Sequence, residues 1–241
     1  SRRIPRLLLS NFIIPLIKCC SQTQIIVQNN TDFKLLKRKL KRGLHRVNGS
    51  GLPEFLVKPV MSDRNEIITI TYIGRLLRSK GVEDLIRFAE KYDHPGVKFI
   101  LAGGLDKQNT DSIDLGSLDI NDNVELLGHI DDVVQLIDSS DVIILPSYRE
   151  GLSRSLIEAL SRGKPIITTY SPGCNELVTN GYNGFKFKAG DLKDMEAAIS
   201  QFVNLNSKEY TKFCYNSREL FLKHYTSEKV AAQYRDILLY H

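Results

Sequence analysis

From Ile67 onward the chain alternates short apolar runs with amphipathic stretches. The runs ITITYI (68–73) and VKFILA (97–102) are rich in β-branched and aromatic residues, which is typical of strands. Between them, the stretch 82–92 places Leu85, Ile86 and Ala89 at the spacing of one helix face. The same patterns predict further strands at 123–127, 141–145, 165–168 and 184–187, and helices at 131–140, within 146–168 and over the last 35 residues.

Strands and helices that alternate at this spacing indicate right-handed crossovers and a parallel sheet covered by helices on both faces. The predicted fold class is therefore α/β, with a doubly wound, Rossmann-like parallel sheet. Sheets of this kind bind ligands in the crevice at the carboxyl ends of their strands. Candidate functional residues are thus sought in the loops that follow the strands.

The first part of the chain does not continue this alternation. The run QIIVQ (24–28) predicts one strand and residues 31–42 predict a helix, while the stretch that follows carries two Gly and two Pro. We therefore expect residues 1–47 to be the tail of a preceding domain. Residues 48–60 form the predicted linker, and residues 61–241 the Rossmann-like domain with its carboxyl-terminal helices.

The chain begins with Ser1-Arg2-Arg3 and the apolar stretch LLLSNFIIPLI, an arrangement that suggests a signal peptide. There is no initiator Met and no small-residue cleavage site, and Pro15 interrupts an apolar stretch too short to span a bilayer. We expect a cut fragment that starts in mid-helix rather than a targeting segment.

Composition narrows the function classes only a little. The 241 residues are 42% hydrophobic and 25% charged, with a net charge of +5 that suits an anionic ligand or surface but also simple solvation. The four cysteines (19, 20, 174 and 214) have no metal-ligand spacing, which indicates a reduced, cytosolic chain. The five histidines are scattered, so neither a zinc site nor a Ser-His-Asp set is predicted.

Two charged loops follow predicted strands. In the loop from Gly74 to Gly81, Arg75 and Lys80 can converge on one anion, the first as a flat fork of donors and the second as a point charge. After the strand 141–145, Ser153 is a plausible N-cap of a helix whose free N–H groups favour anions. Glu150 and Glu158 flank that cap, and a carboxylate can accept hydrogen bonds from both hydroxyls of a sugar diol. A solvated basic loop and ordinary surface glutamates remain alternatives at this point.

Glycines follow two other strands, in Ala102-Gly103-Gly104 and Gly128-His129-Ile130. Each could let a ring or a phosphate approach the backbone, but tight strand-to-helix turns use the same residues. His129 is a weak candidate for a catalytic base, because structural histidines are common.

The joint order of these elements resembles a known family. GRxxxxKG, AGG, LxGxI, PSxxEG with a second Glu eight residues after the first, and GxP follow one another as in the carboxyl-terminal half of retaining GT-B glycosyltransferases of the Glu-x7-Glu type (family 4-like, group 1). QNNTDF and VNGSGLPEFL resemble the stretches before and in that family's interdomain linker, and PGCNELVTNGYNGF its closing segment. The resemblance runs from about Gln24 to the end.

By this resemblance, residues 61–241 would bind a nucleotide-diphospho-sugar and residues 1–47 would belong to an acceptor-side domain. The catalytic set would be Arg75 and Lys80, which hold the diphosphate, and Glu150, which holds the donor sugar's hydroxyls. The resemblance gives donor-binding roles to Glu158 at the ribose, to Gly74, to the backbone N–H groups of Gly151, Leu152 and Ser153, and to the backbone of Ile130 at the base. The family usually has Gly or Pro where this chain has Ser153, which puts the fit of the sugar in doubt.

The implied activity is sugar transfer with retention of configuration, from a UDP-sugar by family habit, to a glycan or lipid-linked acceptor in surface polysaccharide or lipopolysaccharide synthesis. Two fixed cations and a helix N-terminus would stabilise the leaving diphosphate, so the resemblance implies no metal, no cofactor and no nucleic-acid partner. We expect this donor-binding half to be inactive alone. An alternative is a non-catalytic nucleotide-sugar module that works with a separate chain. A dinucleotide-binding domain ranks last, because no GxGxxG follows any strand.

The stretch FKLLKRKLKRGLHR (33–46) places Phe33, Leu36 and Leu40 on one face and Lys37, Arg38, Lys41 and Arg42 elsewhere. Such a helix could rest on an anionic membrane at its inner face, where lipid-linked acceptors lie. A solvated helix face explains the same pattern, and both interpretations stay open. The expected location is cytoplasmic, with or without membrane contact.

Overall fold

A computed structural model describes residues 14–15, 23–40, 42–54, 66–106, 108–118 and 120–240. The predicted apolar start of the chain lies outside the described residues apart from Ile14 and Pro15, and so does most of the predicted linker after residue 54.

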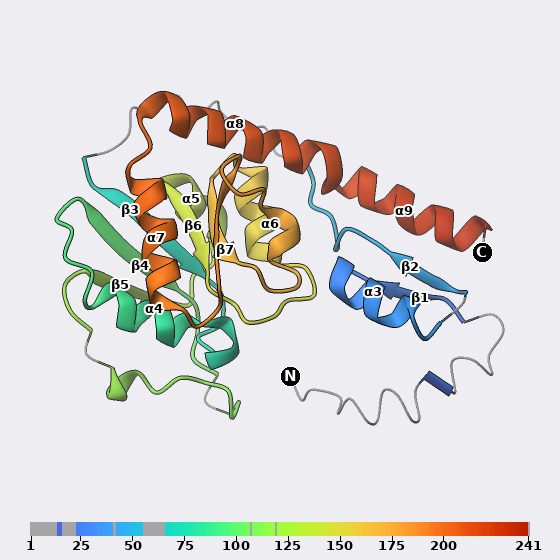
Figure 1. Ribbon diagram of the computed structural model, residues 1–241, viewed down its shortest axis with the longest axis horizontal. Coiled ribbons are helices and arrows are strands. Elements are labelled where there is room, and N and C mark those ends of the chain that lie inside the picture. Colours follow the sequence, from blue (N-terminus) through green and yellow to red (C-terminus); the bar gives the residue numbers. More distant parts are fainter. Residues whose placement is uncertain are drawn as a thin grey trace.

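The main sheet has six parallel strands in the order β5-β4-β3-β6-β7-β8 (Figure 1). From the centre of the sheet, the strand order proceeds from β3 to β5 on one side and from β6 to β8 on the other, with all strands parallel. The doubly wound fold predicted from the sequence is therefore confirmed. The order reverses between β3 and β6, which are paired in parallel. The strands are β3 (Ile68–Ile73), β4 (Val97–Ala102), β5 (Val124–Gly128), β6 (Val142–Leu145), β7 (Ile166–Thr169) and β8 (Gly184–Phe187).

Helices cover the sheet (Figure 1), and α4, α5, α6, α8 and α9 lie close to their predicted positions, whereas α7 was not predicted. Helix α7 packs against β8 and touches α4, whereas α5 contacts β3 and α6, and α8 runs across α6. The helices are α4 (Val82–Ala89), α5 (Val133–Ser139), α6 (Arg154–Ser161), α7 (Leu192–Val203), α8 (Ser207–His224) and α9 (Ser227–Tyr240), with short 3-10 turns η2 (Arg78–Lys80), η3 (Leu115–Ser117) and η4 (Asn175–Leu177).

The centre of the sheet forms the core, because it is covered on both faces. Every residue of β6 and of β7 is buried, which explains why VIIL and IITT are continuous apolar or β-branched runs without alternation. Polar groups at the strand ends are satisfied locally: Thr168 donates to the carbonyl of Leu145 at 2.7 Å, and Thr169 to that of Ser147 at 2.6 Å. The loops that follow β6 and β7 are thereby tied together.

A smaller unit precedes the main sheet. It consists of β1 (Ile25–Val27), α3 (Asn30–Lys37) and β2 (Leu44–Arg46), and its two short strands pair in parallel. We call it the amino-terminal unit. Its core includes Val47, which packs with Val230 and Ile237 of α9, and α9 runs alongside the unit in Figure 1.

One prediction in this region was wrong. The sequence predicted a helix over 31–42, but α3 ends at Lys37 and strand β2 follows. Gly43 turns the chain with a φ of 67°, and a side chain there would meet the carbonyl oxygen of Thr23 at 2.5 Å. With only three residues, LHR shows no alternation from which the strand could be predicted.

The described part of the predicted linker is anchored to the junction of α8 and α9. Leu52 donates to the carbonyl of Tyr225 at 3.0 Å and accepts from the N–H of Ser227 at 2.8 Å. Gly51 lies so close to Ser227 that a side chain on it would come within 2.9 Å of that residue's Cα. The domain boundaries at 47 and 60 stay predictions.

Candidate functional site

Two loops meet where the strand order reverses: Gly74–Gly81 after β3 and Pro146–Ser153 after β6. The N–H of Tyr148 donates to the carbonyl of Ser79 at 3.0 Å, and the hydroxyl of Ser147 donates to the same carbonyl at 3.2 Å. Gly81 has a φ of 68°, and a Cβ on it would lie 2.2 Å from the carbonyl oxygen of Pro146. Glycine is therefore required where the two loops cross.

The close contact of these loops brings Lys80 and Glu150 together. Lys80 Nζ lies 2.5 Å from Glu150 Oε1, and the two side chains are 23% and 11% exposed. An ion pair that is this shielded interacts more strongly than a surface pair, and either charge would be costly without its partner. The structure thus places two of the three predicted catalytic side chains in one pair at the switch point of the sheet.

Arg75, the third, is held differently. Its guanidinium lies 3.6 Å from the carboxylate of Asp106, with both side chains well exposed. The hydroxyl of Tyr72, which is fully buried, donates to the backbone carbonyl of Arg75 at 2.6 Å. Burial raises the pKa of the Tyr72 phenol, the charge of Glu150 raises it further, and the charge of Arg75 lowers it. Arg75 and Glu150 therefore both act on the same buried phenol, although neither is paired with the other.

The loop after β6 leads directly into α6. The N-cap is Ser153 as predicted, and its hydroxyl accepts from the N–H of Leu156 at 3.4 Å. The N–H of Ser153 itself donates to the carbonyl of Gly173 at 3.1 Å. Within the described residues, the N–H groups of Gly151 and Leu152 have no protein partner, so they are available to an anion at this helix end.

The predicted ribose ligand, Glu158, lies in α6 between the buried residues Ile157 and Ala159. Its carboxylate accepts from Arg154 at 2.9 Å, an i,i+4 pair, and 22% of the side chain is exposed. The described contacts join it neither to Arg75 nor to Lys80, so this residue is not part of the Lys80–Glu150 pair.

At the glycine-rich ends of β4 and β5, Gly103 has a structural use, whereas a Cβ on Gly104 or Gly128 would meet nothing within 4 Å. A Cβ on Gly103 would lie 1.8 Å from the carbonyl oxygen of Gly74, so glycine is required for the packing of two strand ends. His129 is 80% exposed and lies 3.6 Å from Asp131. Ile130 is half-buried beside it. Nothing in the described structure connects His129 to Glu150.

Two residues at this site escaped the sequence analysis. Asp111, in the long loop after β4, accepts from the N–H of Ser79 at 3.2 Å and also from its hydroxyl, and thus fixes the turn that carries Lys80. Cys174 is fully buried, and burial, followed by the charge of Glu150, raises its pKa to about 12. Asp111 lies in none of the quoted motifs, whereas Cys174 lies in the PGCNELVTNGYNGF segment, from which no role for the cysteine was predicted.

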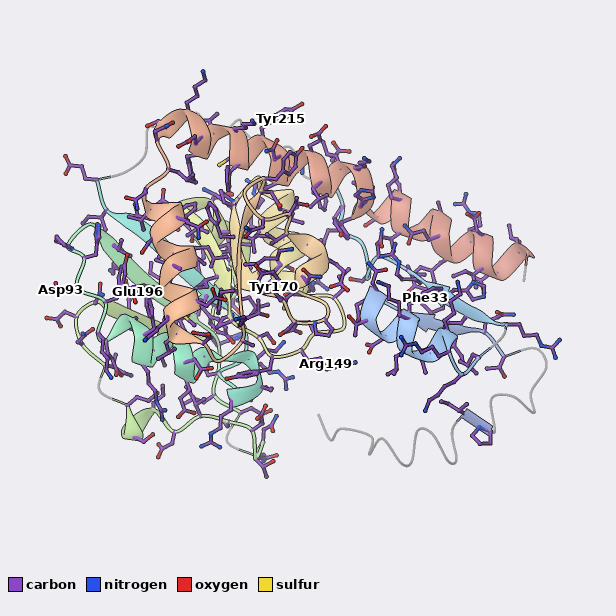
Figure 2. All side chains as sticks on the ribbon, in the orientation of Figure 1. Phe33, Asp93, Arg149, Tyr170, Glu196 and Tyr215 are labelled. Atoms are coloured by element: carbon purple, nitrogen blue, oxygen red, sulfur yellow. The ribbon has the colours of Figure 1, made fainter. Side chains whose placement is uncertain are left out.

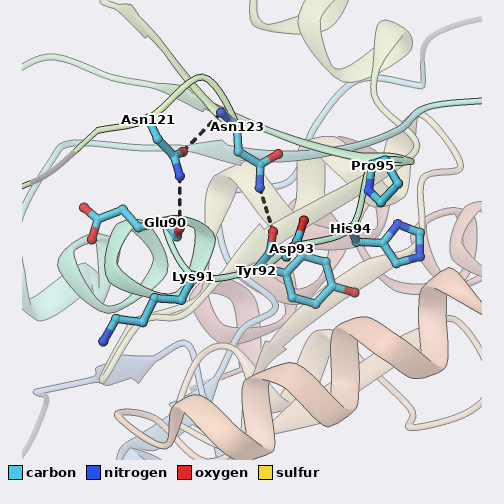
Figure 3. Close-up of a pocket in the computed structure, with 8 residues that line it drawn as sticks. All are labelled: Glu90, Lys91, Tyr92, Asp93, His94, Pro95, Asn121 and Asn123. Atoms are coloured by element: carbon cyan, nitrogen blue, oxygen red, sulfur yellow. Dashed lines mark hydrogen bonds between the residues drawn. The ribbon is translucent and has the colours of Figure 1, made fainter.

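A hollow of about 300 Å³ lies at the opposite edge of the sheet, before β4 and β5 (Figure 3). Its two asparagines cap the end of α4: Asn121 donates to the carbonyl of Glu90 at 2.9 Å, and Asn123 to that of Tyr92 at 3.0 Å. Because these amides are used structurally, the hollow does not compete with the switch point as a candidate site.

Two other kinds of feature were sought in the part of the chain that the structure describes. No cluster of three or more His, Cys, Asp or Glu side chains there could hold a metal ion. Likewise, none of the described helices combines the length and the apolar character that crossing a bilayer requires.

Comparisons with known proteins agree with this fold. The capsular polysaccharide biosynthesis glycosyltransferase CapM of Staphylococcus aureus is 33% identical over 150 residues, which are 61% of this chain and 40% of that protein. An N,N'-diacetylbacillosaminyl-diphospho-undecaprenol α-1,3-N-acetylgalactosaminyltransferase of Campylobacter jejuni is 33% identical over 147 residues, 61% of this chain and 38% of that protein. Anabaena Alr3699/HepE, solved in complex with UDP-glucose, matches with a TM-score of 0.79 at 20% identity, covering 93% of this chain and 66% of that one.

The chain spans about half the length, or less, of the curated relatives it matches. Those relatives include glycosyltransferases of capsular polysaccharide and of lipopolysaccharide core biosynthesis. The family model described as glycosyl transferases group 1 matches residues 60–220, well over half of the chain. This protein therefore belongs to the group 1 glycosyltransferases.

Proposed function

We propose that this chain is the donor-binding half of a retaining GT-B glycosyltransferase of the Glu-x7-Glu type, and that it binds a nucleotide-diphospho-sugar at the switch point of its sheet. One observation carries the proposal: the Lys80–Glu150 pair lies beside the open N–H groups of Gly151 and Leu152. A cation and a helix N-terminus suit a diphosphate, and a carboxylate suits the hydroxyls of a sugar. One ligand that carries both groups matches this combination.

In the proposed reaction, the bond between the sugar and the diphosphate breaks and the leaving diphosphate gains negative charge. Lys80 and the N–H groups of the α6 end would stabilise that charge, because they are held in place before the reaction begins, and Arg75 would add a second cation. Arg75 would exchange its exposed pair with Asp106 for the phosphate, at little cost, since surface ion pairs contribute under about 1 kcal/mol. Glu150 would hold the donor sugar and Glu158 the ribose, with the Ile130 backbone at the base.

Calorimetry of the chain with UDP, other nucleoside diphosphates and inorganic pyrophosphate tests donor binding. Arg75→Ala and Lys80→Ala should each weaken UDP binding by about 1.5–3 kcal/mol, the range for hydrogen bonds to charged groups. Arg87→Ala is the matched control, because Arg87 is an exposed cation paired with Glu83 on α4. Binding of no nucleoside diphosphate, or equal losses in all three variants, would refute the proposal.

The acceptor is proposed to be a glycan or a lipid-linked sugar of surface polysaccharide synthesis, in line with the capsular polysaccharide relative and with the diphospho-undecaprenol in the name of the Campylobacter jejuni relative. Because the chain spans about half of those relatives, a second candidate is a nucleotide-sugar module that acts only with a separate chain. Under either candidate the isolated 241 residues should bind the donor and transfer nothing. Sugar transfer by these residues alone to any glycan or lipid acceptor would contradict both.

We also propose peripheral contact between α3 and an anionic, inner-face membrane. None of the residues of α3 is buried, and Leu35 is 37% exposed beside basic side chains. The described basic residues of this region are Lys34, Lys37, Arg38, Lys39, Arg42 and Arg46. Such a cluster gains about 1 kcal/mol per cation near an anionic surface. Co-sedimentation with vesicles should increase with the anionic lipid fraction, and no dependence on that fraction would identify a solvated face.

A further inference from the structure

The loop that carries Glu150 is held from the amino-terminal unit as well as from its own domain. We define the donor loop as residues 149–153. Asn29, just before α3, has a side chain that is only 1% exposed and donates to the carbonyl of Gly151 at 2.9 Å and, more weakly, to that of Glu150 at 3.4 Å. The same side chain accepts from the N–H of Asp32 at 2.8 Å and is therefore also the N-cap of α3.

Glu176 holds the same junction from the other side. Its Oε1 accepts from the backbone N–H of Asn30 at 3.0 Å, and its Oε2 accepts from the N–H of Gly173 at 2.8 Å. One carboxylate thus joins the first turn of α3 to the loop after β7.

That second loop in turn holds the donor loop. The carbonyl of Pro172 accepts from the N–H of Glu150 at 2.9 Å, and the carbonyl of Gly173 accepts from the N–H of Ser153 at 3.1 Å. Gly173 has a φ of 78°, and a Cβ on it would lie 2.4 Å from the carbonyl oxygen of Glu150, so the two backbones are in direct contact.

An ion pair and the close approach of a side chain to the loop backbone also join the donor loop to the amino-terminal unit. Arg149 pairs with Asp32 in the first turn of α3, and Figure 2 shows Arg149 on the side of the sheet that faces Phe33 and its helix. A side chain on Gly151 would come within 3.0 Å of the Gln28 amide oxygen. The donor loop is therefore held from both sides, by the amino-terminal unit and by the loop 170–176, while Gly151 stays exposed.

We propose that Asn29 and Glu176 are positioning residues that fix the donor loop, so that the amino-terminal unit forms part of the donor site. This inference rests on the proposed function and extends it. Because the unit supplies the Asn29 hydrogen bonds and the Asp32–Arg149 pair to the loop, a displacement of the unit changes where Glu150 and the N–H groups of Gly151 and Leu152 lie. Donor binding and the placement of the acceptor side are thereby coupled through two polar side chains.

Two substitutions separate this role from helix capping. Asn29→Ser keeps a good N-cap for α3 but removes the amide that donates to the donor loop. Glu176→Gln replaces one of the two acceptor oxygens by an NH₂ group. The backbone N–H of either Asn30 or Gly173 then faces a donor and loses its hydrogen bond. Asn206 and Glu209 form a matched pair, because they cap α8 in the same way with no described contact to the donor loop. Asn206→Ser and Glu209→Gln are thus the controls.

Hydrogen exchange of the whole chain, measured without ligand, reports the loop directly. The amides of Glu150 and Ser153 should exchange about tenfold faster in Asn29→Ser and Glu176→Gln, the effect expected when one or two hydrogen bonds are lost, while the amides of α3 stay protected in Asn29→Ser. UDP affinity should fall about fivefold or more in both variants, and both controls should match the wild type in both measurements.

If the amide hydrogen exchange rates of Glu150 and Ser153 stayed within twofold of the wild-type rates in both variants, the inference would be overturned. Faster exchange with unchanged UDP affinity would overturn it as well, because the ligand would then not sense the loop. Failure of the wild type to bind any nucleoside diphosphate refutes the proposed function instead. In that case the exchange measurement alone decides whether Asn29 and Glu176 position the loop.

Discussion

Replacing Glu150 by Gln separates its effect on the fold from its effect on the ligand. The carboxylate lies 2.5 Å from Lys80 Nζ, and both groups are largely shielded, at 11% and 23% exposure. Loss of one partner from a buried pair costs about 3–5 kcal/mol, whereas surface pairs contribute about 0–1 kcal/mol. Since Gln keeps an oxygen that can accept from Lys80, we expect the free energy of unfolding to fall by about 1–2 kcal/mol.

The same substitution should have the opposite effect on a small anion. If the carboxylate and a bound phosphate are taken as unit charges about 10 Å apart, they repel by about 1–2 kcal/mol at an effective dielectric constant of about 20. Inorganic pyrophosphate should therefore bind Glu150→Gln more tightly than the wild type, by up to about tenfold. The preference for a UDP-sugar over UDP should decrease, because a neutral amide is a weaker acceptor for sugar hydroxyls than a carboxylate.

Urea unfolding gives the first quantity, and calorimetry with pyrophosphate, UDP and UDP-glucose gives the second. Glu125→Gln is the control, since Glu125 pairs with Lys98 at 2.6 Å across β4 and β5 and has no described contact with Lys80 or Glu150. Weaker pyrophosphate binding by Glu150→Gln would refute the reasoning, because it would mean that Lys80 does not face the phosphates once Glu150 is neutral.

Three further predictions address other parts of the molecule. Glu158→Ala should weaken UDP binding but not pyrophosphate binding in calorimetry, whereas Arg154→Ala, which removes only the partner of Glu158, should leave both unchanged; equal losses for the two ligands would mean that the role of Glu158 is wrong. Burial lowers the pKa of Lys164, so the folded state binds fewer protons than the unfolded state, and stability should rise with pH from the lowered pKa up to about 10.4. The urea midpoint of the wild type minus that of Lys164→Met, measured across this pH range, isolates this rise. If the two proteins' midpoints changed with pH in parallel, the prediction would be contradicted. Gly173→Ala should cost about 1–3 kcal/mol more than Gly181→Ala in urea unfolding, because both have positive φ but only Gly173 faces a carbonyl, at 2.4 Å; similar costs would show that the contact relaxes freely.

The main sheet was predictable because its central strands β6 and β7 are buried throughout and β3, β4 and β8 are largely buried, with β5 the exception. VIIL and IITT need no alternation when both faces are covered, and their length and turn signals marked them as strands. Strand β2 was not predictable, since its three residues are half-buried or exposed and its partner β1 is equally short. What forms β2 is a turn at Gly43 and packing with a helix far along the chain, and neither is encoded locally.

The sequence motifs predicted which residues lie at the site but not which partners those residues contact. The sequence placed Lys80 and Glu150 in loops at one edge of the sheet, and they are in contact there. It could not foresee that Ser153 gives its N–H to Gly173, or that Arg75 and Glu158 pair with Asp106 and Arg154. Which hydrogen-bond or ion-pair partner a residue has depends on which group lies nearest in three dimensions. Several of these groups come from loops of irregular length, whose paths the sequence does not give.

The packing of Val47 against α9 has a consequence for how the protein is made. The amino-terminal unit leaves the ribosome before the main sheet, yet the side chains that complete its core, Val230 and Ile237, are synthesised after that sheet. The six-stranded sheet can therefore form while translation is still under way, whereas the amino-terminal unit completes its core only after α9 has been synthesised. During that interval Val47 lacks the α9 side chains that cover it, so the unit presents an incomplete core to chaperones and proteases.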